Sequence, residues 1–244
     1  MSGVSLQGKK WIYKDFDHAN VNFIKENYSL DEITAKLLSI RNIKNDNINT
    51  YLEPSIKSLI PNPNVLKDMT KSIDRIFKAI QNREKIGIFG DYDVDGASST
   101  ALLGNYFKKI DHDFEIYIPD RKQEGYGPSI GSFKKLINLG VNIIITVDCG
   151  TMSFEAIDYA NKNNIDVIVI DHHQSEIKLP DAFSIINPNQ IDDKSDLNYL
   201  CAAGVCFMFL VSLNAKLKQN NWFSEKKKKF SKFIRFSRFS FIRN

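Results

Sequence analysis

Cysteine is scarce in this chain, and long apolar segments are missing from it. Its 244 residues include only three cysteines, Cys149, Cys201 and Cys206. An odd number without metal-finger spacing argues against a disulfide scaffold or a zinc finger, and indicates reduced thiols in a cytoplasmic protein. No run approaches the ~20 apolar residues that a membrane helix needs. Because residues 1–13 are polar and basic, we also expect no signal peptide.

The net charge of +4 is unevenly distributed along the chain. From Asn214 onward, ten Lys and Arg residues stand against a single Glu, which gives a balance of +9. Residues 1–213 therefore carry −5, the difference between +4 and +9. Because the main body is mildly acidic, bulk charge does not predict binding to nucleic acid.

The hydrophobic pattern predicts a helical region, residues 1–84, followed by an α/β domain, residues 85–213. In the first region, helices are expected at about 31–40 and 69–81. In the second, short apolar runs alternate with helical stretches, which is typical of a parallel sheet with helices on both faces. We expect about five strands, at 86–90, 114–118, 142–147, 166–170 and 183–187, and helices at about 97–109, 128–139, 153–163 and 200–213.

Four of the expected strands run directly into acidic or histidine residues. In chain order, the segments that follow them are Asp91-Tyr92-Asp93-Val94-Asp95-Gly96, Pro119-Asp120-Arg121, Asp148-Cys149-Gly150 and Asp171-His172-His173. The carboxyl ends of parallel strands meet at one edge of the sheet, where ligands gather. The sequence therefore predicts a single site assembled from these four strand ends.

The residue types at this edge suit a pair of divalent cations. Asp93 and Asp95 lie on one loop, from which both carboxylates can reach neighbouring ions. Asp148 can bridge the ions, and His172 can add an imidazole. One nitrogen ligand among carboxylates favours Mn²⁺ over Mg²⁺. Cations held in this way would activate water for attack on phosphorus.

Other residues at the edge have a supporting role or a structural one. Asp171 and His173 would orient His172 or hold a phosphate oxygen. Asp91 either ligates a cation or only caps the next helix, as aspartates after strands often do. Cys149 is interpreted as a small buried residue, because no partner is positioned to form a thiolate.

Two loops carry alternatives that the sequence leaves open. The segment 119–127 contains Arg121, Glu124 and Tyr126. It is either a loop whose guanidinium holds a substrate phosphate or an exposed loop with a salt bridge. Residues 150–153 precede a helix whose N-terminus either binds an anion or is simply capped by Ser153.

These segments, taken in order, resemble the DHH phosphoesterase family and, within it, the RecJ-type single-stranded-DNA-specific exonucleases. The triplet Asp171-His172-His173 alone is a weak signal, whereas four motifs in order at the family spacing are a specific one. The likeness extends over about residues 10–215. It also takes in residues 59–69, Asn187-Pro188-Asn189 and residues 200–205.

The resemblance implies a 5′-to-3′ exonuclease that releases mononucleotides from single-stranded DNA and serves recombination and repair. It implies Mn²⁺ or Mg²⁺ at a two-metal site. By matching position, the metal ligands would be Asp91, Asp93, Asp95, Asp148 and His172, the catalytic pair Asp171 and His173, and the substrate contacts Arg121, Tyr126, Ser98 and Ser99.

Two parts of the family pattern have no counterpart in this sequence. They are a further metal-ligating aspartate after the helix near residue 205 and a second, DHH-associated domain, to which an OB-fold is often added. We therefore expect a weakened second ion and reduced activity. Residues 214–244 are interpreted as an aberrant tail, out of frame after about Lys226, because the run of four lysines implies a run of adenines in the gene. The other hypothesis is a basic arm that binds nucleic acid.

The predicted function is metal-dependent phosphodiester hydrolysis on single-stranded DNA in the cytoplasm, with no membrane and no predicted protein partner. Two alternatives stay open. One is a different DHH phosphoesterase that acts on short oligonucleotides, cyclic dinucleotides or pyrophosphate. The other is a non-catalytic fragment that binds only a metal or a partner. A long single strand and a dinucleotide, compared as substrates, would separate the two enzymes.

Overall fold

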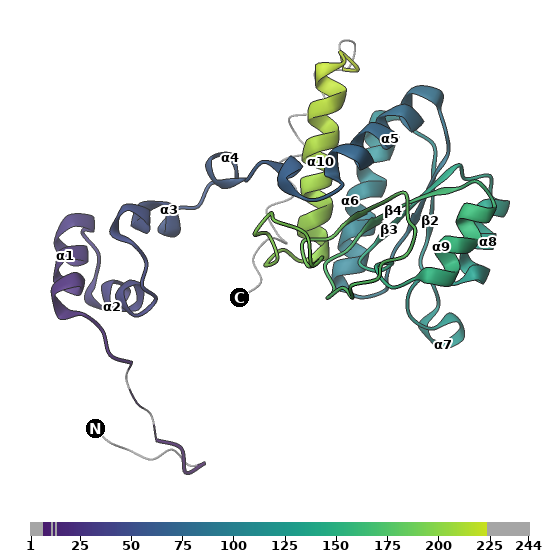
Figure 1. The fold of residues 1–244 in the computed structure, drawn as a ribbon. Helices are drawn as coiled ribbons and strands as arrows, with labels where there is room; N and C mark the ends of the chain where they lie inside the picture. Colours follow the sequence, from purple (N-terminus) through teal and green to yellow (C-terminus); the bar gives the residue numbers. More distant parts are fainter. Residues whose placement is uncertain (1–6, 11, 13, 224–244) are drawn as a thin grey trace. The chain divides into compact units, whose positions relative to one another are not determined.

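The computed structural model describes residues 7–10, 12 and 14–223, which form two compact units (Figure 1). One unit ends at Pro61 and the other begins at Asn62. The predicted boundary after residue 84 thus differs from this division, because helix α5 (Met69–Asn82) packs against elements of the second unit. Most of the predicted basic tail lies outside the described residues.

The first unit is a small helical region. It contains α1 (His18–Tyr28), α2 (Glu32–Ile40), the 3-10 turn η1 (Asn45–Asn47), α3 (Ile48–Leu52) and α4 (Ile56–Leu59). Asp17 caps α1, and Asp31 caps α2 by accepting hydrogen bonds from the amides that follow it. The buried core of this unit is formed by Val21, Ile24, Ala35, Leu38 and Ile48. The predicted N-terminal helical region is therefore confirmed.

The second unit is built on a five-stranded parallel sheet, which confirms the predicted α/β fold. The strands are β1 (Ile86–Phe89), β2 (Phe114–Tyr117), β3 (Ile143–Val147), β4 (Asp166–Ile170) and β5 (Ser184–Ile186). Their spatial order is β2-β1-β3-β4-β5. The chain passes from β1 to β2 on one side, and then returns across β1 to β3 on the other side, so the strand order reverses between β1 and β3. Open α/β sheets bind ligands in the crevice at such a switch point.

Helices cover both faces of this sheet (Figure 1). Helices α5, α6 (Val94–Ile110) and α10 (Ala202–Gln219) pack with one another on one side. Helices α8 (Ile130–Asn138) and α9 (Phe154–Lys162) cover the other. The core under α8 and α9 includes Phe89, Phe133, Ile144, Val167 and Val169. Every residue of the central strands β1 and β3 is buried, as expected for a parallel sheet that is covered on both faces.

Helix α10 runs further than its sequence predicted. The predicted domain ended at residue 213, whereas α10 continues to Gln219. Leu213 and Leu217 are fully buried, and Lys216 Nζ lies 2.7 Å from Asp74 Oδ1 on α5. The helix is thus extended by apolar contacts spaced one turn apart and by an ion pair. No helix in the described part of the chain is long and apolar enough to cross a bilayer.

Candidate metal centre

The loop after β1 brings two carboxylates to the edge of the sheet. Asp93 is the N-cap of α6, and its Oδ1 accepts a hydrogen bond of 2.9 Å from the Gly96 amide. Asp91 is buried beneath this turn. A Cβ at position 96 would lie 2.6 Å from the Asp91 Cβ, so the close approach of α6 to Asp91 requires glycine. Asp93 therefore both caps α6 and carries a carboxylate at the edge of the sheet.

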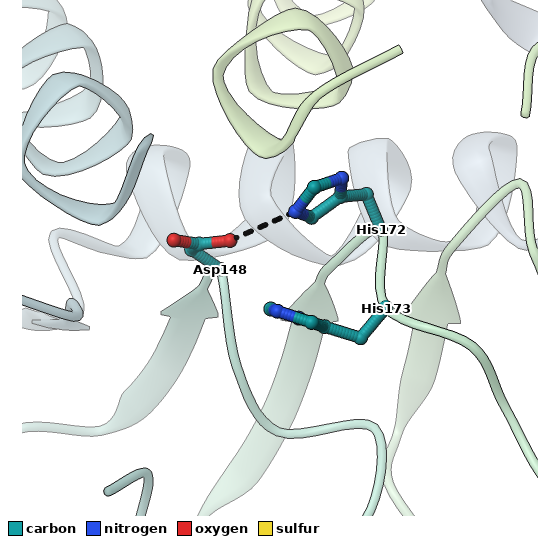
Figure 2. Close-up of side chains that lie close together, drawn as sticks. All are labelled: Asp148, His172 and His173. Atoms are coloured by element: carbon teal, nitrogen blue, oxygen red, sulfur yellow. Dashed lines mark ion pairs between the residues drawn. The ribbon is translucent and has the colours of Figure 1, made fainter. Parts of the chain in front are cut away.

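Asp148 follows β3 in a conformation that is uncommon for a residue with a side chain. Its φ is 61°, in the left-handed region, and its amide donates to the carbonyl of Ile170 at 3.0 Å. The side chain is 1% exposed, and neither carboxylate oxygen has a hydrogen-bond partner of good geometry in the structure. His172 Nε2 lies 3.3 Å from Oδ1, within ion-pair distance (Figure 2). Because buried carboxylate oxygens without partners are costly, this residue fits a cation ligand.

Two overlapping groups of possible ligands meet at Asp148. One carboxylate oxygen each from Asp91, Asp93 and Asp148 lie within 4.8 Å of one another. Ligand atoms of Asp148, His172 and His173 form the second group at the same mutual distance. Oxygen with imidazole nitrogen is a donor set suited to Mn²⁺. Asp148 is common to both groups, and its role as a bridge between two ions stays a prediction.

The carboxylates in the first group destabilise one another's charge. Burial, together with the neighbouring Asp93 carboxylate, raises the pKa of Asp148 to about 6, although His172 opposes the shift. Burial also raises the pKa of Asp91. The pKa of Asp93 is lowered, despite some desolvation, by the hydrogen bond from the Gly96 amide. A cation among these groups would offset their desolvation and repulsion.

Asp171 differs from these carboxylates because its oxygens already have partners. Its Oδ2 accepts hydrogen bonds from the amide (3.1 Å) and hydroxyl (2.6 Å) of Thr151. Its Oδ1 accepts from the His172 amide and lies 2.7 Å from His173 Nδ1. These bonds outweigh burial and lower the pKa of Asp171 to about 2. Asp171 belongs to neither ligand group, so it acts as a residue that orients its neighbours.

The hydrogen bond to Asp171 fixes the ring of His173. Because a carboxylate only accepts, Nδ1 carries the proton and Nε2 is the nitrogen left for a substrate or ion. The same hydrogen bond raises the pKa of His173, although burial opposes the shift. Figure 2 shows His172 paired with Asp148, which comes from a different strand, and His173 on the same loop as His172. The two histidines therefore have different partners.

Two residues that support the histidines had no role in the sequence prediction. Asn187, directly after β5, donates from Nδ2 to Thr151 Oγ1 at 3.0 Å and to the His173 carbonyl at 2.9 Å. Asn189 donates from its side chain to the His172 carbonyl. The motif Asn187-Pro188-Asn189 was noted only as part of the family likeness. Its place after a strand was the signal that could have assigned it to the same edge.

The segment 119–127 contributes an aromatic residue to the site. Tyr126 donates from its hydroxyl to the Asp148 carbonyl at 3.2 Å, and its ring meets that of His173 edge to face, with centroids 6.2 Å apart. The Arg121 guanidinium lies over the Tyr92 ring, 4.7 Å from its centroid. Arg121 is exposed at the start of the short helix α7 (Arg121–Glu124). Its predicted contact with substrate stays a prediction.

The salt-bridge interpretation of the same loop is confirmed at Glu124. The Glu124 carboxylate accepts the Tyr117 hydroxyl at 2.7 Å and pairs with Lys135 Nζ at 3.2 Å. These contacts join α7 to β2 and α8. Glu124 thus holds the loop in place, and the loop in turn carries Arg121 and Tyr126.

The three predicted residues that follow Asp93 lie in α6, and two of them face away from the ligand groups. Asp95 is in neither group, and its carboxylate interacts with the Cys201 thiol. Ser99 is fully buried and donates to the Asp95 carbonyl at 2.7 Å, which contradicts its assignment as a substrate contact. Ser98 is half-buried, and its assignment stays a prediction. The sequence could not show that residues one turn apart on α6 face the α10 side.

The loop after β3 bears on two of the predictions. Cys149 is 1% exposed, and burial raises the pKa of its thiol, which confirms that it is a small buried residue. Ser153 precedes α9 but makes no capping hydrogen bond. Its hydroxyl instead lines a cleft beside His173.

Comparison with known proteins agrees with this fold. A sequence model of the DHH family, N-terminal domain, matches residues 85–233. The chain belongs to the DHH family. Single-stranded-DNA-specific exonuclease RecJ of Bacillus subtilis is 32% identical over 85% of this chain and 26% of its own length. RecJ of Haemophilus influenzae is 34% identical over 75% of this chain and 32% of its own length.

The chain therefore spans about a quarter to a third of the length of these curated relatives. Among solved structures, exonuclease RecJ bound to manganese superposes with a TM-score of 0.57 at 29% identity, over 62% of this chain and 38% of that one. RecJ of Thermus thermophilus in complex with Mn²⁺ gives a TM-score of 0.65 at 23% identity, over 82% and 28%, which shows a shared fold.

Proposed function

We propose that this DHH unit hydrolyses phosphodiester bonds of single-stranded DNA, with Mn²⁺ or Mg²⁺ held by Asp91, Asp93, Asp148 and His172. The observation that carries the proposal is the buried Asp148 carboxylate, which lies where both ligand groups meet and whose oxygens accept no hydrogen bond. The curated relatives named above are single-stranded-DNA-specific exonucleases, and one solved RecJ structure is bound to manganese.

The chain's own residues would bind and orient the substrate. A divalent cation, when bound, supplies charge that lowers the pKa of water and polarises a phosphoryl oxygen. Asp171 fixes His173 so that Nε2 faces the scissile phosphate, and the raised pKa of His173 favours the protonated ring, which donates to an anionic oxygen. Tyr126 closes one side of His173, and Arg121 adds a guanidinium for a phosphate farther along the strand.

Finer features of the proposal rest on the family likeness. They are 5′-to-3′ polarity, release of mononucleotides, and a role in DNA recombination and repair in the cytoplasm. Asp95 remains the predicted ligand of a second cation. It would have to leave the Cys201 thiol to reach the Asp91–Asp148 group.

Manganese binding tests the centre directly. Free Mn²⁺, measured by its electron paramagnetic resonance signal, should fall as wild-type protein is added. Asp148→Asn should weaken binding by more than about 100-fold, because even outer-shell ligand partners are worth about 10–100-fold. Asp158→Asn is the matched control, since Asp158 is exposed on α9 and pairs only with Lys162. Unchanged Mn²⁺ affinity in Asp148→Asn would contradict the proposed centre.

Hydrolysis is then compared on a long single strand, its duplex and a dinucleotide. Cleavage of the single strand, dependent on Mn²⁺ and absent in Asp148→Asn, is expected. Cleavage of the dinucleotide alone would favour a short-oligonucleotide phosphoesterase. Metal binding without hydrolysis of any of the three would favour a non-catalytic role.

A further inference from the structure

A cleft of about 850 Å³ opens beside His173, on the side of α8 and α9. It is lined by residues 126–131, by residues 150–156, and by Asp171 and His173. His173 belongs both to this cleft and to one of the ligand groups. Whatever occupies the cleft therefore lies next to the position proposed for the scissile phosphate.

One of the residues that line the cleft, Gly131, has no side chain. Gly131 lies in the first turn of α8, and its φ is not left-handed. A Cβ there would meet only Ser129 Oγ, at 3.8 Å. A helical glycine is destabilising relative to alanine, and neither backbone conformation nor packing requires glycine at this place. The open space that Gly131 leaves is therefore available to a ligand.

The rim of the cleft is apolar and solvent-exposed. Tyr126, Ile130 and Met152 are 58%, 44% and 41% exposed, and all three line the cleft. Flat aromatic groups such as nucleobases gain most from contact with aromatic and apolar side chains of this kind. The hydroxyls of Ser129 and Ser153 line the same cleft and offer hydrogen bonds to a sugar.

The lining has few groups that could distinguish one base from another. The bidentate contacts that distinguish guanine and adenine come from Arg, Lys, Asn and Gln side chains. None of these four residue types is among the described residues that line the cleft. The charged side chains there are Glu155, His173 and Asp171, and Asp171 is already fully hydrogen-bonded.

We propose that this cleft binds the nucleoside adjacent to the scissile phosphate, holding its base by stacking and apolar contact without reading its identity. The proposal rests on the proposed function for the position of the phosphate. It adds a subsite for the base, in which Tyr126, Ile130 and Met152 contact the base and Gly131 leaves space for it. It also predicts that any of the four bases is accommodated.

The test uses the full chain in Mg²⁺ and three small ligands. They are 5′-dAMP, 5′-dTMP and 2-deoxyribose 5-phosphate, which lacks a base. Ligand-observed nuclear magnetic resonance should give comparable affinities for the two nucleotides. The base-free sugar phosphate should bind at least about tenfold more weakly, as expected when a stacked base is lost.

Gly131→Phe fills the cleft and should reduce the affinity for both nucleotides to that of 2-deoxyribose 5-phosphate. Lys134→Phe places the same ring on the exposed side of the same helix and should leave all three affinities unchanged. Met152→Ala shortens the rim at an exposed position and should weaken only the two nucleotides. Gly131→Ala should raise the melting temperature, which would show that the fold does not require glycine there.

Wild-type affinity for nucleotides in folded Gly131→Phe, or equal binding of 2-deoxyribose 5-phosphate and the nucleotides, would overturn the cleft assignment. So would a strong preference for one base. Manganese binding is measured separately. If nucleotides bound more tightly than the base-free sugar phosphate but Mn²⁺ did not bind, the proposed hydrolysis would be refuted and the cleft assignment would stand. If metal-dependent hydrolysis were observed but the base made no difference to binding, only the cleft assignment would be refuted.

Discussion

Replacing Asp148 by asparagine should make the metal-free protein more stable while removing its metal site. The substitution keeps the size of the side chain, and asparagine tolerates the left-handed φ of 61° at this position. It removes a buried negative charge that lies against Asp93. A ligand whose charge is unfavourable without its ion should therefore show a trade-off between stability and binding.

The magnitude follows from the pKa of Asp148, which burial raises from 3.8 to about 6. Below the unfolded value both states are protonated, and the charge has no effect on stability. As pH rises from about 4 to 6, the unfolded state ionises first, so the free energy of unfolding of the wild type falls. Two pKa units correspond to about 3 kcal/mol, and relaxation of the site reduces this to about 1–3 kcal/mol.

Urea unfolding in the presence of a chelator measures this difference. At about pH 8, the free energy of unfolding of Asp148→Asn should exceed that of the wild type by about 1–3 kcal/mol. At about pH 4, the two free energies should converge. Mn²⁺ at about 100 times its Kd should stabilise the wild type by about 2.7 kcal/mol and the variant by almost nothing. If the variant were less stable than the wild type at both pH values, the claim that the Asp148 charge destabilises the metal-free protein would be refuted.

Three further substitutions test other parts of the unit. Asp171→Asn should destabilise the fold by about 2 kcal/mol near pH 7, because the pKa of Asp171 is lowered to about 2; the same stabilisation of the wild type should disappear as pH falls from about 4 to 2, as urea unfolding can show. Gly96→Ala places a Cβ 2.6 Å from the Asp91 Cβ, so it should lower both the melting temperature and the affinity for Mn²⁺. Phe133→Ala, in the core under α8, should cost about 3–5 kcal/mol in unfolding free energy without changing Mn²⁺ affinity in the folded protein.

Much of the fold was predictable because its signals are local. The apolar runs predicted the β-strands to within one or two residues, and the charged first turn after Asp31 marked the start of α2. The predicted start of α6, at residue 97, was three residues late, because α6 begins at Val94. The end of α10 was missed because Lys216 and Lys218 resemble a solvated tail. In the structure, Lys216 pairs with Asp74 and Leu217 is buried, contacts that depend on a distant helix.

The candidate site was predictable only in part. The strand-end positions of Asp91, Asp93, Asp148 and His172 indicated a common edge, and the structure brings them together. The direction of side chains within α6 was not predictable from spacing. For that reason Ser99, which is buried on the α10 side, was wrongly expected to contact substrate.

The sequence by itself determined the parallel sheet, the edge at which its polar residues gather, and the family to which the chain belongs, because strand periodicity and motif order are properties of neighbouring residues. Only the tertiary structure decided which of those residues are hydrogen-bonded and which remain open to a cation. Asp148 lacks hydrogen-bond partners whereas Asp171 is saturated with them, although both are aspartates that directly follow a buried strand. The difference arises from Thr151 and from the left-handed turn at Asp148, which place one carboxylate against amide and hydroxyl donors and the other against a second carboxylate.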